Sequence, residues 1–506
     1  MNRVPDRVPV LVVGAGPTGA TAAIDLAQRG VDVTVLDRWD DVYPQPRAVH
    51  LDDEVYRLLG GLGVAEEFAA ISRPAEGLQL VRRDLSVLAR FDRSGVSPAT
   101  GLPRANMFDQ PDLERVLRDR MDRLDAVHLV GGVEVLAVER AGHQGTVRYR
   151  DLRDGTEGVV AADVVLGCDG ANSVVRSALG ARLDDLGFAQ RWLVVDVETD
   201  LDLAQWEGVH QVCDHRRAAT YMRIGTTRYR WELQLLGDED ATDFQHLDAL
   251  LPLIEPWTGA AGAADDLKLV RVAEYTFRAA IADRWRDGPV FLLGDAAHLT
   301  PPFIGQGMGA GLRDATNLAW KVAGVLDGSL SVDVLDTYAP ERSAHARAMI
   351  TTARLVGQVM TGGGRVGDLA RGLALPVLTR LPLLTARMRD SETPALDVGC
   401  WSVDGGGALV GTLCPDAELP AGRLDRVVGP GWALVTLTPP APSDAARLAA
   451  LGVVVVEASG TVLEPWLGRS QAALVRPDRT VLATSDVLSL TTTADRLLRP
   501  PRKDTP

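Results

Sequence analysis

The chain has little cysteine: only four occur in 506 residues, and no two of them form a CxxC pair. None has a histidine at metal-ligand spacing, so the sequence predicts a reduced, cytoplasmic protein with no metal site. No apolar run is long enough to span a membrane, and the first residues lead directly into an apolar strand without the pattern of a signal peptide. A disulfide scaffold, a zinc protein and a membrane protein are therefore not expected.

Positive charge is also in deficit. Lysine and arginine total 53 against 68 acidic residues, for a net charge of −15 and a pI of about 5.1. Basic residues are scattered, which argues against nucleic acid or an anionic membrane as a partner. The 46% hydrophobic and 24% charged composition is typical of a globular protein. At this length we expect two to three domains.

The first informative motif follows the apolar run at residues 8–13, which is typical of a buried parallel strand. A GxGxxG loop, a helical stretch and a second strand ending in an acid come next, the order found in dinucleotide-binding units. Glycine permits the tight turn and the approach of a pyrophosphate, while the acid can accept a ribose hydroxyl. NAD and FAD both fit. The candidate cofactor-binding residues are Gly14, Gly16, Pro17, Thr18, Gly19, Asp37 and Arg38.

Two later stretches also end strands with an acid. DVVLGCDG runs into Asp169 and a helix carrying Arg176, which alone would be an ordinary turn. The stretch GDAAHLTPPFIGQGMGAGLRDATNLAWK, residues 294–321, joins a strand end to a glycine-rich helix start. A carboxylate at that strand end can bind a sugar-alcohol chain, and the helix start favours the negative edge of a reduced flavin. The candidates here are Gly294, Asp295, Gly305, Gly307, Met308 and Gly309.

Together the GxGxxG loop, the CDG at residues 168–170 and the 294–321 stretch resemble the class A flavoprotein monooxygenases, which have the para-hydroxybenzoate hydroxylase fold. The resemblance covers roughly residues 8–350. It implies FAD along both glycine stretches, with Arg47 and Gln110 also contacting it. It further implies that NADH or NADPH binds only transiently, near Asp169 and Arg176. Pro301 and Pro302 would lie beside the reacting atoms.

A closer resemblance is to the 3-(3-hydroxyphenyl)propionate hydroxylase branch of that family. PRAVHLDDEVYRLL, WLVVDVE, LDTYAPERSAHARAMI and VRPDRTVLAT carry it. One departure is Gly309, where many members have Asn. Because the backbone donors stay in place, we expect the enzyme to remain active.

Between residues 184 and 268, apolar residues alternate with polar and aromatic ones, which predicts an antiparallel sheet. In the resembled fold such a sheet covers the substrate cavity. Aromatic walls with a few polar groups suit a phenol. His50 is a candidate base for the phenol proton, with a structural role as the alternative; His298 is expected to brace its loop. The candidate substrate-binding residues are His210, Tyr221, Arg223, Arg230 and Trp231.

The predicted fold is α/β: an FAD-binding Rossmann-like domain, an inserted antiparallel sheet and a thioredoxin-like C-terminal domain without CxxC. The expected boundaries are 1–183 and 269–394 for the two parts of the FAD-binding domain, with substrate-domain strands near 75–105. The inserted sheet takes 184–268 and the C-terminal domain 395–506. We expect a packing or dimer role for the C-terminal domain, and a homodimer stays open.

The function predicted from these residues is hydroxylation of an electron-rich phenolic ring by O2 and NAD(P)H through a flavin hydroperoxide, on a substrate such as 3-(3-hydroxyphenyl)propionate. One alternative is a tailoring oxygenase for a polycyclic natural product, acting by hydroxylation or Baeyer–Villiger insertion, since fold does not fix substrate. Another is a non-catalytic flavin- or ligand-binding protein.

Overall fold

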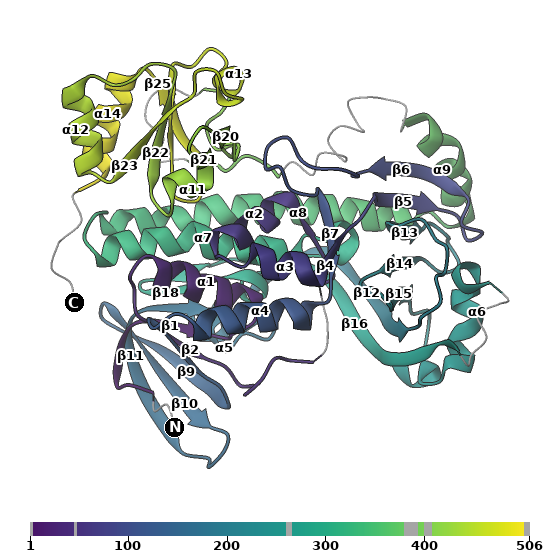
Figure 1. The fold of residues 1–506 in the computed structure, drawn as a ribbon. Helices are drawn as coiled ribbons and strands as arrows, with labels where there is room; N and C mark the ends of the chain where they lie inside the picture. The colour runs from purple at the N-terminus through teal and green to yellow at the C-terminus, as the bar shows by residue number, and fades with distance from the viewer. Residues whose placement is uncertain (1–3, 45–47, 260–265, 379–392, 399–406, 500–506) are drawn as a thin grey trace.

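The structure, a computed structural model, describes residues 4–44, 48–259, 266–378, 393–398 and 407–499 (Figure 1). It contains three larger units. Segments of the first two units alternate along the chain, and long helices precede the third. Within the described residues, no helix is both long and apolar enough to cross a membrane.

The first unit is a mixed sheet with the order β17-β18-β11-β1-β2-β8, extended by β9 and β10. Strands β1, β2, β8, β11 and β18 run parallel, so their carboxyl ends meet at one edge. Helices α1 (Pro17–Gln28) and α7 (Gly307–Leu326) pack together there. The strands are β1 (Arg7–Val13), β2 (Val33–Leu36), β8 (Val127–Val130), β9 (Val133–Ala141), β10 (Gln144–Asp151), β11 (Glu157–Gly167), β17 (Arg286–Asp287) and β18 (Val290–Leu292).

A small sheet with the order β3-β7-β4 lies beside this unit, and α2 and α3 contact each other next to it. Helices α4 and α5 pack against β8 and β9 of the first unit. These elements are β3 (His50–Asp52), α2 (Asp53–Gly61), α3 (Ala65–Ile71), β4 (Ser72–Pro74), β7 (Ala105–Phe108), α4 (Gln110–Asp122) and α5 (Val174–Ala178).

The second unit is an eight-stranded sheet with the order β19-β16-β12-β15-β14-β13-β5-β6. Helix α6 (Leu247–Thr258) covers one of its faces with an apolar cluster (Figure 1). Its strands are β5 (Gly77–Val81), β6 (Val87–Asp92), β12 (Leu183–Glu198), β13 (Val209–Val212), β14 (Ala219–Arg223), β15 (Arg228–Gln234), β16 (Lys268–Ala282) and β19 (His298–Leu299). Strand β16 carries this sheet from Lys268 to Ala282.

The C-terminal unit is a four-stranded sheet with the order β23-β22-β24-β25, in which only β22 and β23 are parallel. It rests on α7 and has its own apolar cluster (Figure 1). Its elements are α11 (Leu424–Val428), β22 (Trp432–Thr436), α12 (Pro442–Ala450), β23 (Val453–Glu457), α13 (Leu463–Leu467), β24 (Ala472–Val475), β25 (Val481–Ser485) and α14 (Val487–Leu497). Helices α8 (Tyr338–Thr361) and α9 (Gly364–Leu378) precede it; Cys400 lies outside the described residues.

Candidate active site

The glycine loop between β1 and α1 leaves space at one position only. A Cβ on Gly14, whose φ is +99°, would lie 2.5 Å from the Cys168 carbonyl oxygen, and one on Gly19 would lie 1.9 Å from the Gly14 oxygen. Packing alone therefore requires both glycines. A Cβ on Gly16 would meet nothing within 4 Å, and no side chain caps α1. An open position beside uncapped helix N–H groups fits the approach of a pyrophosphate.

Asp37 directly follows β2 and holds the glycine loop in place. Its Oδ2 accepts a hydrogen bond from the Ala15 N–H at 2.5 Å, and its Oδ1 accepts one from the Trp39 N–H at 2.8 Å. Arg38, the next residue, lies over the Trp39 ring at 5.6 Å from the ring centre. The acid is thus fixed beside the loop, where an adenosine ribose would bind in a dinucleotide fold.

Gln110 and the segment before His50 are joined across the site. Gln110 begins α4, and its Oε1 accepts a hydrogen bond from the Ala48 N–H at 2.6 Å. Arg47 lies outside the described residues. Gln110 therefore anchors the segment in which Arg47 was expected to contact FAD.

Asp169 and Arg176 connect two loops at the carboxyl edge of the first sheet. The Asp169 carboxylate accepts hydrogen bonds from the Ser173 hydroxyl at 2.5 Å and the Val175 N–H at 3.1 Å, and burial raises its pKa. Arg176 donates to the Ala296 carbonyl oxygen at 3.0 Å. These contacts stabilise the start of α5 and tie it to the loop that contains Asp295.

The loop after β18 is held from below by α7. Asp314, fully buried on that helix, accepts hydrogen bonds from the Gly294 N–H at 3.0 Å and from His298 Nε2 at 2.8 Å. His298 therefore braces its loop, as the sequence indicated. A Cβ on Gly294 or Gly311 would lie 2.7 or 2.3 Å from Thr18 Oγ1. Only glycine at these positions lets the first helix, α7 and the loop meet, with half-buried Asp295 at the loop's edge.

The turn before α7 contains most of the remaining predicted cofactor residues. Gly305 has a φ of +65°, and a Cβ there would lie 2.7 Å from His50 Nδ1. No side chain caps the helix, so its first turn at Gly307 and Met308 offers free backbone donors. A Cβ on Gly309 would lie 3.0 Å from both Arg313 and Val55. An Asn at this position would therefore crowd both side chains.

Sequence reasoning missed the ion-pair network beneath this turn. Arg313 donates to Asp52 Oδ2 at 2.7 Å and to both Glu54 oxygens at 2.8 and 2.9 Å. Gln306 donates to the same Asp52 oxygen at 2.8 Å. The acidic run DDE and the GLRDA helix are visible in the sequence, but 254 or more positions separate the partners.

His50 lies at the start of β3, beside Gly305. Burial and the positive charge of Arg93 lower the pKa of its ring to about 4, so the imidazole is neutral at pH 7. Pro301 and Pro302 precede Gly305, with Pro301 buried and Pro302 half-buried. The structure thus brings His50 and the turn together.

The predicted substrate-binding residues lie on two opposite faces of the second sheet, because successive side chains of a strand point to alternate faces. His210, Tyr221 and Trp231 face α6, where Trp257 Nε1 donates to His210 Nδ1 at 3.2 Å and the rings pack together. We call this the outer face. Arg223 has the same parity as Tyr221 and donates to Glu207 at 2.9 Å.

Arg230 lies on the opposite face, which we call the inner face. It is fully buried, and it donates to both oxygens of Asp196 at 2.6 and 2.9 Å. Gln211 shares this face, and its Nε2 donates to the Phe303 carbonyl oxygen at 2.6 Å. Phe303 lies between Pro302 and Gly305, so the inner face is the one turned towards the candidate flavin site. The period-two alternation could have separated the two faces, but it could not show which one covers the site.

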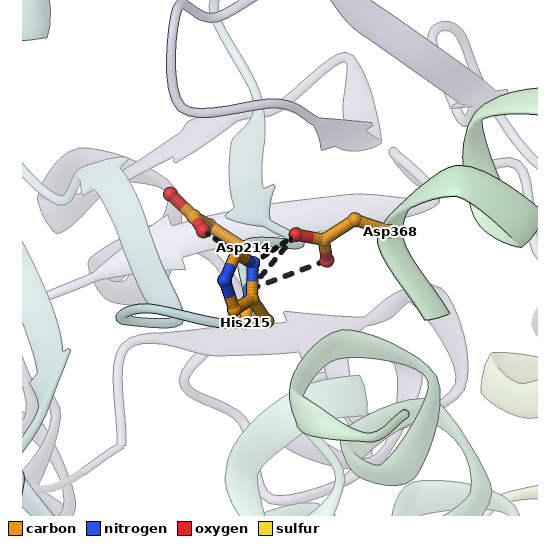
Figure 2. Close-up of side chains that lie close together, drawn as sticks. All are labelled: Asp214, His215 and Asp368. Atoms are coloured by element: carbon orange, nitrogen blue, oxygen red, sulfur yellow. Dashed lines mark hydrogen bonds and ion pairs between the residues drawn. The ribbon is translucent and has the colours of Figure 1, made fainter. Parts of the chain in front are cut away.

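One group of potential metal ligands lies at the rim of the second sheet. Asp214, His215 and Asp368 lie close together between the loop after β13 and α9, as Figure 2 shows. His215 Nδ1 is 3.4 Å from Asp214 Oδ1 and also hydrogen-bonded to Asp368. Two guanidiniums, those of Arg216 and Arg371, pair with the two carboxylates. This charge balance is typical of an ion-pair network that holds α9 on the sheet.

The fold and the site together define a FAD-dependent enzyme built as the class A flavoprotein hydroxylases are. Residues 7–353, more than half of the chain, match the family model described as "FAD binding domain", and the chain belongs to this family. The uncapped helix starts, the open position at Gly16 and the glycine turn all fit that cofactor.

Curated relatives give the class of reaction. The chain is 35% identical over 436 residues to a probable NADH-specific resorcinol 4-hydroxylase of Rhodococcus jostii (strain RHA1), covering 85% of this chain and 79% of that protein. It is 34% identical over 524 residues to a 3-(3-hydroxy-phenyl)propionate/3-hydroxycinnamic acid hydroxylase of Burkholderia cenocepacia (strain HI2424), covering 96% and 95%. The protein is a flavin-dependent aromatic monooxygenase.

Solved structures share the whole architecture. The anhydrotetracycline hydroxylase OxyS of Streptomyces rimosus superposes with a TM-score of 0.80 at 25% identity, covering 98% of this chain and all of that one. The flavin-dependent monooxygenase PieE gives 0.79 at 23% identity, with 97% and 99% covered. The likeness to PieE concerns the fold alone.

Proposed function

We propose that the protein hydroxylates a single-ring phenol, with NADH as the electron donor and O2 as the oxygen source. The extended similarity to the resorcinol and hydroxyphenylpropionate hydroxylases supports a monocyclic substrate, and the name of the first relative supports NADH. Since the reaction consumes NADH, we propose a cytoplasmic location. When bound, FAD supplies the two-electron transfer and the activation of oxygen.

The residues of the chain would then divide the work as follows. Gly14, Gly16 and Thr18 would hold the pyrophosphate, and Asp37 the ribose. Asp295 would bind the ribityl chain, while the first turn of α7 would stabilise negative charge on the ring through its free N–H groups. The inner face of the second sheet would cover the substrate and exclude water.

The structural observation that supports this proposal is a hydrogen bond between the inner face and the turn before α7. Gln211 reaches the Phe303 carbonyl oxygen at 2.6 Å, which joins the sheet to the segment expected beside the flavin. A substrate between the two would meet polar groups of the sheet on one side and the turn on the other.

The test is NADH consumption by the purified yellow protein with resorcinol, 3-(3-hydroxyphenyl)propionate and a hydroxybenzoate, with products identified by mass. We expect at least one of these phenols to accelerate NADH oxidation and to give a product heavier by one oxygen. If NADH oxidation does not respond to any of them, the proposal is wrong.

A second candidate is the tailoring of a polycyclic aromatic compound. OxyS, an anhydrotetracycline hydroxylase, shares nearly the full length and the three-unit architecture. Turnover of a polycyclic quinone without turnover of any monocycle would favour this candidate. A non-catalytic flavin-binding protein would bind FAD yet show no substrate-stimulated NADH oxidation.

A further inference from the structure

The inner face of the second sheet presents one row of side chains from four neighbouring strands. Cross-strand register sets Gln211 opposite Thr220, Thr220 opposite Glu232, and Glu232 opposite Val194. Directly paired residues share a face, so the four side chains lie on the side that Gln211 marks by its bond to Phe303. Glu232 is the one ionisable member of this row.

Glu232 is buried but unpaired within the described part of the chain. Its side chain is 7% exposed, and it has no hydrogen bond or ion pair with any described residue. Its cross-strand neighbours are a hydroxyl and an isopropyl group, neither of which is a cation. By register the residue lies on the inner face, and its 7% exposure shows that it is not completely enclosed there.

The positive charge that acts on Glu232, that of Arg230, already has a carboxylate partner. Arg230, two residues along the same strand, donates to both oxygens of Asp196, and Arg271 lies 3.9 Å from that carboxylate. Beyond them Arg228 pairs with Asp109 at the start of α4. Burial consequently raises the pKa of the Glu232 carboxyl to about 7, and Arg230 offsets this only in part. A base with a pKa near the working pH is the most effective one for a proton transfer.

We propose that Glu232 is a catalytic residue that accepts the proton of the substrate's phenolic hydroxyl. The phenol O–H bond breaks, a new O–H bond forms on the carboxylate, and the electron pair stays on the phenolate oxygen. The ring then attacks an electrophile more readily, and the proton returns to that oxygen in the product. This inference rests on the proposed function and deepens it.

The same group selects the substrate by charge. An ionised Glu232 accepts a hydrogen bond from a neutral phenol but repels a ring that carries its own carboxylate nearby. The guanidinium of Arg230 is held by Asp196, so a substrate carboxylate would have to displace that acid. We therefore expect resorcinol-like, uncharged phenols to bind better than 3-(3-hydroxyphenyl)propionate.

The test compares the FAD-loaded wild type with Glu232→Gln, using resorcinol and measuring hydroxylated product from pH 5.5 to 9. In the wild type, kcat/KM should rise about tenfold per pH unit and level off near pH 7. The Glu232→Gln variant should lose this rise and fall by about 10²-fold at pH 8. Glu232→Asp should keep the rise, with a lower plateau. Glu157→Gln removes an exposed acid of β11, in the first sheet, that pairs with Arg150. It is the matched control and should match the wild type.

Binding supplies a readout independent of turnover. The dissociation constants of resorcinol and 3-(3-hydroxyphenyl)propionate at pH 8, followed by flavin absorbance, should differ less in Glu232→Gln than in the wild type. A Glu232→Gln variant with the wild-type pH profile and the wild-type ratio of constants would overturn the role of Glu232 alone. If Glu232→Gln does not retain FAD, the Glu232→Asp variant decides. A Glu232→Asp variant whose kcat/KM does not rise with pH would then overturn the role of Glu232. A wild type that converts no phenol would overturn both this inference and the proposed function.

Discussion

Arg57 of α2 and Asp425 of α11 form two hydrogen bonds, of 2.6 and 2.7 Å, although 368 positions separate them in the chain. Arg57 also donates to the Cys414 carbonyl oxygen at 2.6 Å, and Arg479 donates to Asp425 at 2.7 Å. The two guanidiniums hold the pKa of the Asp425 carboxyl at about 2. This cluster fastens the C-terminal unit to the helix that begins beside Asp52.

Loss of the Asp425 charge should loosen the C-terminal unit. Asp425→Asn leaves Arg57 buried without its counter-charge, so we expect the free energy of unfolding to fall by about 3 kcal/mol. Urea unfolding and protection of the C-terminal unit from proteolysis measure this. Asp495→Asn, which removes the partner of the more exposed Arg447, should change the unfolding midpoint little. Equal effects of the two substitutions would contradict a special role for the Arg57 cluster.

Substituting alanine for Gly16 should weaken FAD binding, whereas substituting it for Gly311 should lower the stability of the protein. Gly16→Ala meets no protein atom within 4 Å, so the FAD-free protein should keep its stability while FAD binds at least about tenfold more weakly. Gly311→Ala brings a methyl group to 2.3 Å from Thr18 Oγ1 and should destabilise the FAD-free protein by about 1–3 kcal/mol.

FAD titration and thermal unfolding without FAD separate these two effects. Combining Gly311→Ala with Thr18→Ala should recover part of the stability, because the clashing hydroxyl is removed. A Gly16→Ala variant that unfolds earlier without FAD would show that the position has a packing role after all.

Acid should destabilise the protein through its buried histidines. Burial lowers the pKa of both His50 and His210 to about 4, from an ordinary value of 6.5. Between those values the unfolded chain binds more protons, so stability falls as pH drops from 6.5 to 4, by up to about 1.4 kcal/mol per pH unit for each ring. His50→Asn should reduce this slope, whereas the exposed His143→Asn should not; urea unfolding at pH 6.5 and 4.5 measures it.

Glu232 should have the opposite dependence. Its pKa is raised to about 7 from 4.5, so the folded protein binds more protons between these values, and its contribution to stability is lost as pH rises through that window. Glu232→Gln should therefore lose less stability between pH 5 and pH 8 than the wild type does. Unfolding at both pH values checks this, with Glu157→Gln as the control. Parallel pH curves for the wild type and Glu232→Gln would mean that Glu232 is solvated.

The family and much of the FAD-binding part could be predicted from the sequence because their signals are local. A strand, a glycine loop and a helix follow one another within thirty residues. Glycine is needed where the backbone takes a positive φ, as at Gly14 and Gly305. The bracing of the loop by His298 was also correctly predicted. The roles of individual residues in binding FAD and substrate, the domain boundaries and a homodimer stay predictions.

Contacts between residues far apart in the sequence were decided by the tertiary structure alone. Period-two alternation in β13–β15 fixes that His210 and Gln211 point to opposite faces, because successive side chains of a strand alternate. Which face covers the flavin turn depends on where α6 and Phe303 pack, and Phe303 is 92 positions from Gln211. The same holds for Arg313 with Asp52 and for Arg57 with Asp425. Sequence determines the local geometry and the chemistry of each group, whereas burial and neighbours, which set the basicity of Glu232, exist only in the folded chain.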